Sequence, residues 1–531
     1  MTLQSYLKLR NGTDVRGVAC DGIADEPITL TAEIAKNVAK AFCVWLISHT
    51  GKTQVTVAIG YDSRITSPEL CEAVVSGVIT TGHNAIVTGL STTPSMFALL
   101  KDTEKMNERY CQGSIMITAS HLPFNRNGLK FFSHSGGLEA SDVKEILELA
   151  ATYRFAETAN LGERIDAPYL DRYAASLVEK VRTATGEEKP LAGKRIVVDA
   201  GNGAGGFFAD KVLIPLGADT TGSQFLEPDG TFHNHIPNPE NAAAMHSVCE
   251  AVKAANADFG IIFDTDVDRA GAVDKDGTEI NRNRLIALIS AILLSERKGT
   301  IVTDSVTSDG LAKFVAARGG KHLRFKRGYK NVINEAIRLN ESGEYAPLAI
   351  ETSGHAALYE NYFLDDGAYL ITRLLIAMAN AAKEGKNLTD LISSLEMPAE
   401  AQELRVNFKS GVDFKTLGQR LIEEFTAYGQ SLYYATPAPD NHEGFRLRYD
   451  EHHGNGWALM RMSLHDPVLP INVESETKGG AVKIVKDLYY FLRKYDFLDL
   501  SPLENSIAAW RKNKIEEVSA KFGVTSKTPN E

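Results

Sequence analysis

The chain has 531 residues, which is long enough for several domains, and its content of 44% hydrophobic and 24% charged residues is typical of a globular protein. Its formal net charge of -11 argues against nucleic acid or an anionic membrane as the main partner. A small anionic ligand can still bind where basic side chains gather locally.

The cysteines and the apolar segments indicate the compartment. The five cysteines are scattered and form no C-x-x-C pair, so we interpret them as free thiols in a reducing compartment, with no zinc site. The N-terminal sequence MTLQSYLKLRN lacks the basic and apolar regions of a signal peptide. The longest apolar run, Leu285–Leu294, is too short to span a bilayer and predicts a buried helix. We therefore expect a cytoplasmic protein.

Short β-rich runs alternate with segments of helical periodicity along most of the chain. The predicted strands are Thr56–Asp62, Asn84–Leu90, Gly113–Ser120, Arg195–Gly203, Asp258–Asp266, Thr300–Val306 and Pro347–Gly354. Ala32–Ile47 and Ser308–Gly319 are two of the predicted helices, because their apolar residues recur at helical spacing. Strands that alternate with amphipathic helices indicate α/β layers.

The last part of the chain differs from the rest. WALMRMS and VLPINVES, separated by LHDP, predict a hairpin, and a helix from about Gly480 to Lys494 follows. This pattern is typical of an α+β domain. We therefore expect four domains, at residues 1–160, 161–298, 299–400 and 401–531.

The segment IFDTDVDRAG carries Asp264, Asp266 and Asp268 at alternate positions directly after an apolar run. On an extended loop this spacing places three carboxylates on one side, where their repulsion favours a bound cation. Hard oxygen ligands indicate Mg²⁺ or Ca²⁺. An EF-hand does not fit, because Arg269 and Lys275 stand where that loop needs glycine and glutamate. A solvated acidic loop is the alternative.

The stretch GSIMITASHLPFNRNGLKFF begins as a buried strand and becomes small and polar at Ser120 and His121. A serine past a strand end can be a helix N-cap, a turn residue or a nucleophile, and taken alone the cap is the commonest of these. The flanking glycines of a G-x-S-x-G elbow are missing. The NRNG turn predicts a hairpin that returns Lys130 to Ser120, as a proton carrier, a phosphate contact or a solvated side chain.

Two further stretches combine residue types that bind sugars and phosphates. In AIETSGH, Glu351, Ser353 and His355 alternate on one face and suit sugar hydroxyls, although a helix start with a capping serine fits equally well. In RMSLHDP, Arg461 and Ser463 flank a turn whose backbone N–H groups suit an anion. An ordinary hairpin with a surface arginine is the alternative there.

Together and in this order, these stretches resemble the α-D-phosphohexomutase superfamily, and within it the phosphomannomutase/phosphoglucomutase group. TASHLPFNRNGLK resembles the phosphoserine loop, DTDVDR the metal loop and ETSGH the sugar-binding motif. NGTDVRG, EPDGTFHNHIPNPEN and FKRGYK resemble motifs of the first three domains. RMSLHDP stands where the family has R-x-S-x-T-E-P, so His465 and Asp466 depart from the pattern, as does Leu122 after Ser-His. The change at His465 removes a hydroxyl contact to phosphate.

The resemblance implies three similar α/β domains with mixed sheets and a smaller α+β C-terminal domain around a central cleft. It also implies an isomerase that interconverts hexose 1-phosphate and hexose 6-phosphate, of mannose or glucose, through a phosphoserine enzyme and a hexose 1,6-bisphosphate intermediate, which is also the activator. Phosphoglucosamine mutase, phosphopentomutase, a metal-dependent phosphatase and a non-catalytic sugar-phosphate-binding relative are alternatives.

The resemblance assigns roles to residues of this sequence. The catalytic group is Ser120, His121, Lys130 and Arg16. The Mg²⁺ ligands are Ser120, Asp264, Asp266 and Asp268. The substrate-binding group is Arg269, Lys326, Gly328, Tyr329, Glu351, Ser353, His355, Arg461, Ser463 and His465. We expect a monomer or dimer that takes a phosphorylated sugar and binds neither nucleic acid nor a membrane.

Overall fold

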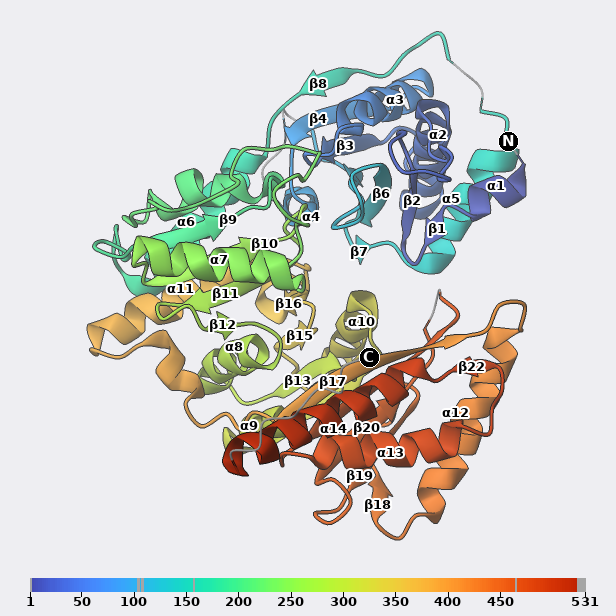
Figure 1. Cartoon of the computed structure of the whole chain (residues 1–531). Coiled ribbons are helices and arrows are strands. Elements are labelled where there is room, and N and C mark those ends of the chain that lie inside the picture. The colour runs from blue at the N-terminus through green and yellow to red at the C-terminus, as the bar shows by residue number, and fades with distance from the viewer. Residues whose placement is uncertain (1, 103–105, 107–108, 156–157, 464–465, 523–531) are drawn as a thin grey trace. The chain divides into compact units, whose positions relative to one another are not determined.

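The structure is a computed structural model that describes residues 2–102, 106, 109–155, 158–463 and 466–522, with side chains as far as residue 516 (Figure 1). The chain divides into two compact units. The first comprises Met1–Arg297 and Ala346–Ser393, and the second comprises Lys298–Tyr345 and Ser394–Glu531. Within the described part of the chain, none of the helices combines the length and the apolar character that crossing a bilayer requires.

The first sheet of the first unit has the strand order β1-β2-β6-β5-β3-β4-β8, with β7 beside β6. Its strands are β1 (Arg10–Asn11), β2 (Asp14–Val18), β3 (Thr56–Tyr61), β4 (Asn84–Leu90), β5 (Gly113–Ile117), β6 (Arg126–Ser133), β7 (Gly136–Gly137) and β8 (Arg164–Asp166). β3 pairs in parallel with β4 and β5, whereas β6 runs antiparallel to β5 and β2. The sheet is therefore mixed, and its antiparallel part carries the predicted hairpin.

Helices cover both faces of this sheet. They are α1 (Leu3–Leu7), α2 (Ala32–Thr50), α3 (Ser67–Thr80), α4 (Thr93–Lys101) and α5 (Ala140–Thr152). In β3, Val57 and Ile59 belong to the apolar cluster that residues of α2, α3 and α5 form with the sheet. A Cβ on the next residue, Gly60, would instead lie 2.6 Å from Met96 Sδ of α4. Because successive side chains of a strand point to opposite faces, α4 covers the face opposite α2.

A second sheet of the first unit has the order β12-β11-β10-β9. Its strands are β9 (Ile196–Asp199), β10 (Phe259–Phe263), β11 (Ala270–Asp274) and β12 (Glu279–Ile280). The remaining elements of this unit are α6 (Leu170–Thr185), η1 (Ala204–Gly206), η2 (Phe208–Leu213), α7 (Ala242–Ala255), α8 (Asn283–Glu296), β15 (Leu348–Ile350), β16 (Ala356–Leu358), η3 (Tyr359–Asn361), α11 (Gly367–Lys383) and η4 (Leu388–Ile392). β10 pairs in parallel with β9 and antiparallel with β11, so the acidic loop connects two neighbouring strands.

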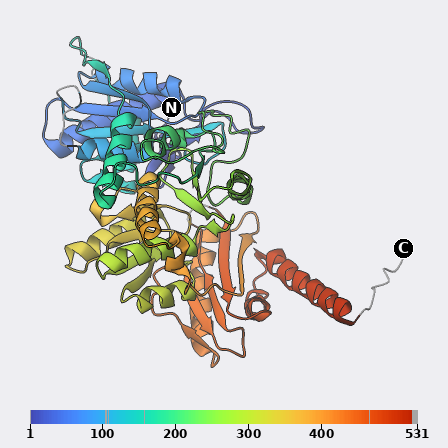
Figure 2. The same cartoon turned by 90° about the vertical axis from the view of Figure 1, so that its left-hand side faces the viewer.

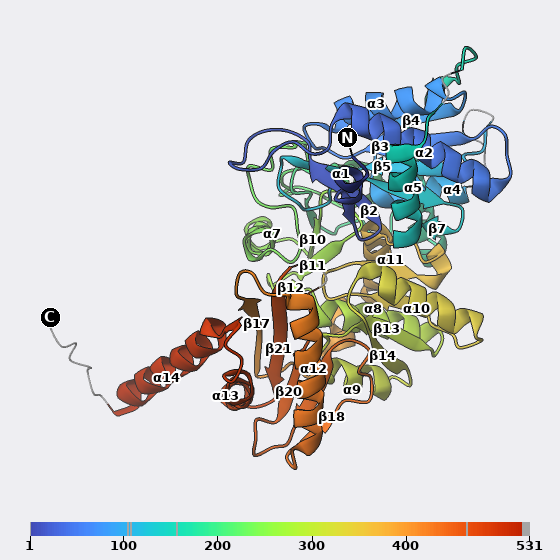
Figure 3. The ribbon, with the colours of Figure 1, turned by 90° about the vertical axis from the view of Figure 1, so that its right-hand side faces the viewer.

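The second unit contains the parallel pair β13 (Thr300–Asp304) and β14 (Lys321–Phe325), with α9 (Asp309–Ala317) and α10 (Tyr329–Glu341). Its larger sheet has the order β18-β19-β20-β21-β17-β22. The strands are β17 (Glu400–Phe408), β18 (Ala435–Pro437), β19 (Phe445–Tyr449), β20 (Gly456–Met460), β21 (Val468–Ser475) and β22 (Leu498–Asp499). The helices are α12 (Phe414–Ser431), α13 (Gly480–Leu492) and α14 (Ser501–Phe522). Figures 2 and 3 show α14 running away from this sheet.

The predicted elements are present, and they differ from the structure mainly at their ends. The ranges predicted for the strands that carry site motifs include residues that lie in loops in the structure. For example, the predicted strand Gly113–Ser120 is longer than β5, which ends at Ile117. The predicted C-terminal hairpin is confirmed by the antiparallel pair β20 and β21, and the helix after it is α13. Leu285–Leu294 is confirmed as a buried helix, the centre of α8. The last helix, α14, was not predicted.

Gly128 in the N-G-x-K stretch sits where backbones approach too closely for a side chain. A Cβ there would lie 2.4 Å from the Val15 carbonyl oxygen and 2.7 Å from that of Thr118. Gly128→Ala should destabilise the first unit by about 1–3 kcal/mol, because backbone atoms must move apart. Differential scanning calorimetry should show a lower transition midpoint. The control, Gly137→Ala, places its Cβ at an ordinary 3.6 Å from Phe132, and an equal shift for both variants would contradict this packing.

Candidate active site

Ser120 lies in the loop between β5 and β6, 3% exposed, with its backbone in the left-handed region at φ 51°. Its hydroxyl group donates to Asp264 Oδ2 at 2.9 Å and accepts a hydrogen bond from Arg269 Nη2 at 3.0 Å. A left-handed backbone costs a non-glycine residue roughly 1–2 kcal/mol, so surrounding contacts must hold it. The loop leads into a strand, so the interpretation of Ser120 as a helix N-cap is wrong.

The three aspartates converge in the loop between β10 and β11. Asp264, Asp266 and Asp268 are buried, and one carboxylate oxygen of each lies within 4.8 Å of the others. Asp266 Oδ1 and Asp268 Oδ1 have no hydrogen-bond partner among the described residues. Val267 has φ 67°, which a β-branched residue rarely adopts. Buried carboxylate oxygens without donors, held by an unusual backbone, form a donor set that could bind a metal ion.

Lys130 projects from β6 into the same carboxylates. It pairs with Met116 of β5 in the antiparallel ladder, which confirms the predicted hairpin. Its Nζ donates to Asp266 Oδ2 at 2.8 Å and to Asp268 Oδ2 at 2.6 Å, and its side chain is 5% exposed. Lys130 is therefore no solvated surface lysine. Its ammonium group and a metal ion would compete for the same carboxylates.

His121 and Arg269 complete the surroundings of the serine hydroxyl. His121 Nδ1 lies 3.3 Å from Ser120 Oγ and also contacts Arg269 Nη2. Burial, together with the positive charges of Arg269 and Arg16, lowers the pKa of His121 to about 2. The imidazole is therefore neutral at physiological pH, and its Nδ1 accepts the hydrogen bond from Arg269.

The carboxylates of the acidic loop differ in proton affinity. Burial, with repulsion from Asp268, raises the pKa of Asp264 well above its ordinary value. Burial acts in the same direction on Asp268, but the nearby charges of Lys130, His355 and Arg269 outweigh it and lower the pKa of Asp268. Asp268 is thus the carboxylate that the surrounding cations hold in its ionised form.

His355 also faces the acidic loop. Its Nδ1 lies 2.6 Å from Asp365 Oδ2 and 3.8 Å from Asp268 Oδ1. Burial opposes the charged imidazolium, but Asp365 and Asp268 raise the pKa of His355 to about 9. Asp268, His355 and Asp365 form a second group of potential metal ligands, whose ligand atoms lie within 4.8 Å of one another. His355 is therefore protonated at neutral pH and adds a positive charge beside the aspartates.

Glu351 and Ser353 reach the site through a turn, where the alternating sequence predicted an extended face. The Glu351 N–H donates to the His355 carbonyl oxygen at 2.9 Å, and Gly354 has φ 97°. A Cβ on Gly354 would lie 2.6 Å from the Ala270 carbonyl oxygen, so the turn packs directly on the start of β11. Ser353 Oγ donates to Glu351 Oε2 at 3.4 Å. The carboxylate and the hydroxyl group that we predicted to bind the sugar therefore lie next to each other.

Arg16 lies on β2, opposite Gly128 of β6 in the antiparallel ladder. Its guanidinium group makes a 2.7 Å ion pair with Asp14, and its charge contributes to the low pKa of His121. The first unit therefore brings together the predicted catalytic and metal-binding residues and the sugar-binding motif.

The other predicted substrate-binding residues belong to the second unit. Lys326 is exposed, and Gly328 and Tyr329 form the start of α10. Arg461 follows β20 and is 8% exposed, and its Nε has no hydrogen-bond partner among the described residues. Burial lowers the pKa of Arg461. The Asp466 N–H donates to Ser463 Oγ at 3.2 Å, whereas His465 lies outside the described residues.

Sequence reasoning missed several residues that contact predicted ones. Thr93, at the start of α4, donates its hydroxyl to Asp266 Oδ2 and its N–H to the Asp266 carbonyl oxygen. Asp365 pairs with His355, and Glu443 lies 3.8 Å from Arg461. The two adjacent aspartates in FLDDG, which begin ten residues after His355, could have indicated Asp365 as a site residue. Thr93 and Glu443 carry no local signal, because their partners are distant in sequence.

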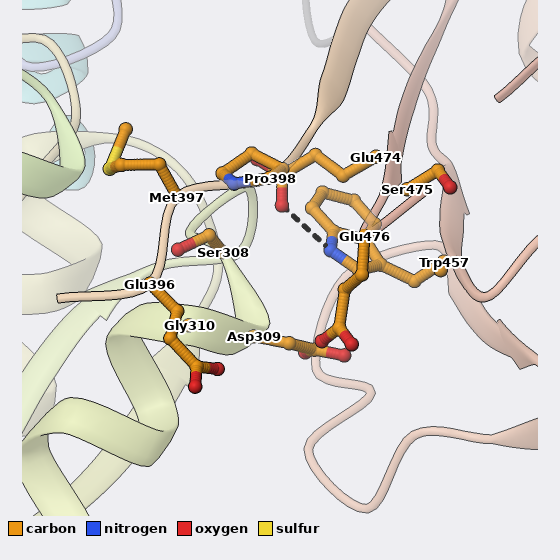
Figure 4. Close-up of a pocket in the computed structure, with 11 residues that line it drawn as sticks. Ser308, Asp309, Gly310, Glu396, Met397, Pro398, Trp457, Glu474, Ser475 and Glu476 are labelled. Atoms are coloured by element: carbon orange, nitrogen blue, oxygen red, sulfur yellow. Dashed lines mark hydrogen bonds between the residues drawn. The ribbon is translucent and has the colours of Figure 1, made fainter. Parts of the chain in front are cut away.

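The second unit also has a cavity of about 340 Å³ that contains no predicted site residue (Figure 4). Its lining is Ser308, Asp309, Gly310, Glu396, Met397, Pro398, Gly456, Trp457, Glu474, Ser475 and Glu476. Its acidic residues already have partners. Trp457 Nε1 donates to Glu474 at 2.9 Å, and Lys313 pairs with Glu396 and Glu476.

Comparison with known proteins gives matches along most of the chain. Three sequence profiles, described as Phosphoglucomutase/phosphomannomutase, alpha/beta/alpha domains I, II and III, match residues 8–157, 171–277 and 281–397. They confirm the expected three α/β domains, and the β-rich C-terminal region follows the third. The exact domain boundaries stay a prediction.

Relatives and a solved structure agree with these profiles. Phosphoglucomutase of Neisseria meningitidis serogroup B is 30% identical over 474 residues, which cover 89% of this chain and 94% of that protein. Phosphomannomutase/phosphoglucomutase of Pseudomonas syringae is 28% identical over 483 residues, covering 91% and 94%. The X-ray structure of a phosphoglucomutase/phosphomannomutase family protein from Burkholderia thailandensis has 27% identity and a TM-score of 0.76, covering 93% of this chain and 98% of that one.

Replacing Lys130 tests whether its ammonium group and Mg²⁺ bind the same carboxylates of the acidic loop. Lys130→Met leaves buried carboxylates without their ammonium partner, which costs about 3–5 kcal/mol. Without divalent cations the variant should melt at a lower temperature than the unchanged protein. Millimolar Mg²⁺ should then raise the melting temperature more in the variant, because no ammonium group competes.

The matched control is Lys144→Met, which removes an exposed pair with Glu148 at 3.1 Å. Such a surface pair contributes at most about 0.5 kcal/mol. An equal Mg²⁺ response in Lys130→Met and in the unchanged protein would contradict a shared carboxylate site.

Proposed function

This chain belongs to the phosphoglucomutase/phosphomannomutase family, and on that premise we propose that it interconverts hexose 1-phosphates and hexose 6-phosphates of glucose, mannose or both. The observation that carries this proposal is the contact of Ser120 Oγ with Asp264 and Arg269 inside a buried cluster of aspartates. A hydroxyl held between a carboxylate and a guanidinium group suits a site that carries a phosphoryl group and balances its charge.

The donor set supports Mg²⁺ as the cofactor, held by Asp264, Asp266 and Asp268 together with the group on Ser120. When bound, the ion supplies positive charge to the phosphoryl oxygens. Arg269 donates to Ser120 Oγ and therefore stays beside the group that is transferred. Thr93 and Arg269 hold the carboxylates in place, since each donates a hydrogen bond to one of the three aspartates.

In the transfer we propose, the bond between phosphorus and Ser120 Oγ breaks as a bond to a sugar hydroxyl oxygen forms. The proton of that hydroxyl group ends on Ser120 Oγ, so atoms and charge balance. Lys130 relays this proton: its ammonium group gives one proton to Ser120 Oγ and takes one from the sugar hydroxyl group. His121 holds Arg269 through its neutral ring, and Arg16 adds positive charge nearby. The product is a hexose 1,6-bisphosphate, which returns its other phosphoryl group to Ser120 and also serves as the activator.

Substrate contacts complete the proposal. We assign the ring hydroxyls to Glu351, Ser353 and His355, whose carboxylate, hydroxyl and imidazolium groups offer both donors and acceptors. We assign phosphate and sugar contacts to Arg269, Lys326, Gly328, Tyr329, Arg461, Ser463 and His465. Arg461 Nε is buried and has no hydrogen-bond partner among the described residues, which supports this role for Arg461 because such a donor requires an acceptor. A cytoplasmic location is part of the same proposal, supported by the five free cysteines, and we propose a monomer or dimer.

Ser120→Ala tests the proposal directly. With Mg²⁺ and a trace of glucose 1,6-bisphosphate, the unchanged enzyme should convert glucose 1-phosphate or mannose 1-phosphate to the 6-phosphate without releasing inorganic phosphate. Loss of the nucleophile should lower kcat at least about 10⁴-fold. The exposed Ser135→Ala serves as the control. Near-normal turnover in Ser120→Ala, or net phosphate release by the unchanged enzyme, would refute the mutase.

Arg461→Lys tests the phosphate contact. Lysine keeps the charge but loses the planar fork, which should weaken phosphate binding by about 1.4 kcal/mol and raise KM about tenfold. Steady-state kinetics should show a much smaller change in kcat. Arg420→Lys, whose side chain is 75% exposed, should change neither constant. An unchanged KM in Arg461→Lys would remove Arg461 from the phosphate site.

A further inference from the structure

Arg64 is a fully buried arginine that the proposed mechanism does not use. It follows β3 in the segment GYDSR, and its side chain is 0% exposed. Asp62 Oδ2 lies 3.5 Å from Arg64 Nε, and Asp62 Oδ1 accepts from the Arg64 N–H at 3.0 Å. A charged side chain this deeply buried requires extensive compensation by hydrogen bonds, and one carboxylate supplies only part of it.

The terminal nitrogens of the guanidinium group donate to backbone carbonyls of the Ser120 loop. Arg64 Nη1 donates to the carbonyl oxygens of Pro123 and Arg126, both at 2.8 Å. Arg64 Nη2 donates to the carbonyl oxygens of Ser120 and Leu122. One guanidinium group thus binds four carbonyls within residues 120–126, a stretch that has little regular structure of its own before β6 begins at Arg126. Because the guanidinium is planar and rigid, it fixes these carbonyls relative to one another.

A segment of the EPDGTFHNHIPNPEN motif covers this guanidinium group. The ring of Phe232 lies over Arg64, with its centroid 5.2 Å from Cζ. A Cβ on Gly230 would lie 2.4 Å from the Ile65 nitrogen and 2.6 Å from the Ser63 carbonyl oxygen. Glycine is therefore required there for the segment to pack against the backbone on either side of Arg64. The cover keeps water from competing for the four carbonyls.

We propose that Arg64 is a positioning residue that sets the conformation of the Ser120 loop, with Phe232 and Gly230 as its cover. It contacts the carbonyl of Ser120, not the hydroxyl, and so acts through the loop backbone. That backbone is left-handed at Ser120, a conformation that persists only when neighbouring contacts hold it. The loop conformation in turn directs Ser120 Oγ towards Asp264 and Arg269. The inference rests on the proposed role of Ser120 as the phosphoryl carrier.

Arg64→Lys is the test, because lysine keeps the charge but cannot bind four carbonyls as a planar fork. We expect kcat to fall about 100-fold, since small misplacements of a reacting group have effects of this size. KM should change less than about threefold, because substrate contacts remain. Phosphorylation of Ser120 by glucose 1,6-bisphosphate, followed by rapid quench and peptide mass spectrometry, should slow in proportion to kcat. Hydrogen exchange should rise in the Ser120 loop and stay unchanged elsewhere in the first unit.

Arg126→Lys is the matched control, since its side chain pairs with Glu26 at 2.8 Å and is 32% exposed. It should keep kcat, KM and the exchange pattern. If Arg64→Lys does not fold, Phe232→Ala removes only the cover and should lower kcat with the same rise in loop exchange. Unchanged kcat and loop exchange in the variant that folds would overturn the positioning role. A failed proposed function is distinguishable, because the unchanged enzyme would then acquire no phosphate on Ser120.

Discussion

The structure depends on holding three aspartate carboxylates, buried, within 4.8 Å of one another. Like charges at that separation repel strongly once water is removed, and each also loses its hydration. Lys130 and Arg269 offset part of this charge, and His355 adds a third positive group beside Asp268. Asp266 Oδ1 and Asp268 Oδ1 still lack hydrogen-bond donors among the described residues. A bound cation would compensate the remaining negative charge.

The same constraint explains where the backbone departs from ordinary geometry. Ser120 and Val267 both adopt left-handed conformations, one in each loop that meets at the site. Such conformations persist where surrounding contacts outweigh their cost. Around Ser120 those contacts come from Arg64, and around Val267 they include the Gly367 N–H, which donates to its carbonyl oxygen. In these conformations the two loops place the Ser120 hydroxyl group beside the Asp264 carboxylate.

The parts of the site that follow from local sequence could be predicted, whereas those that depend on distant pairs could not. The alternation of Asp264, Asp266 and Asp268 after an apolar strand predicted their convergence. The NRNG turn predicted the hairpin that carries Lys130, whose ammonium group contacts Asp266 and Asp268. In Glu351–His355, alternation wrongly indicated an extended face, because a left-handed Gly354 makes a turn. Arg64 gave no local signal, since its four carbonyl acceptors lie more than fifty residues later.

The account requires that a phosphoryl group on Ser120 and the carboxylates of the acidic loop bind one and the same cation. Electron–nuclear double resonance with Mn²⁺ in place of Mg²⁺ measures this most directly, since a coordinated phosphate couples its ³¹P nucleus to the metal. The phosphorylated enzyme, free of sugar phosphate, should show that coupling, and the dephosphorylated enzyme should lose it while still binding Mn²⁺. Bound Mn²⁺ without ³¹P coupling in fully phosphorylated enzyme would contradict the shared site.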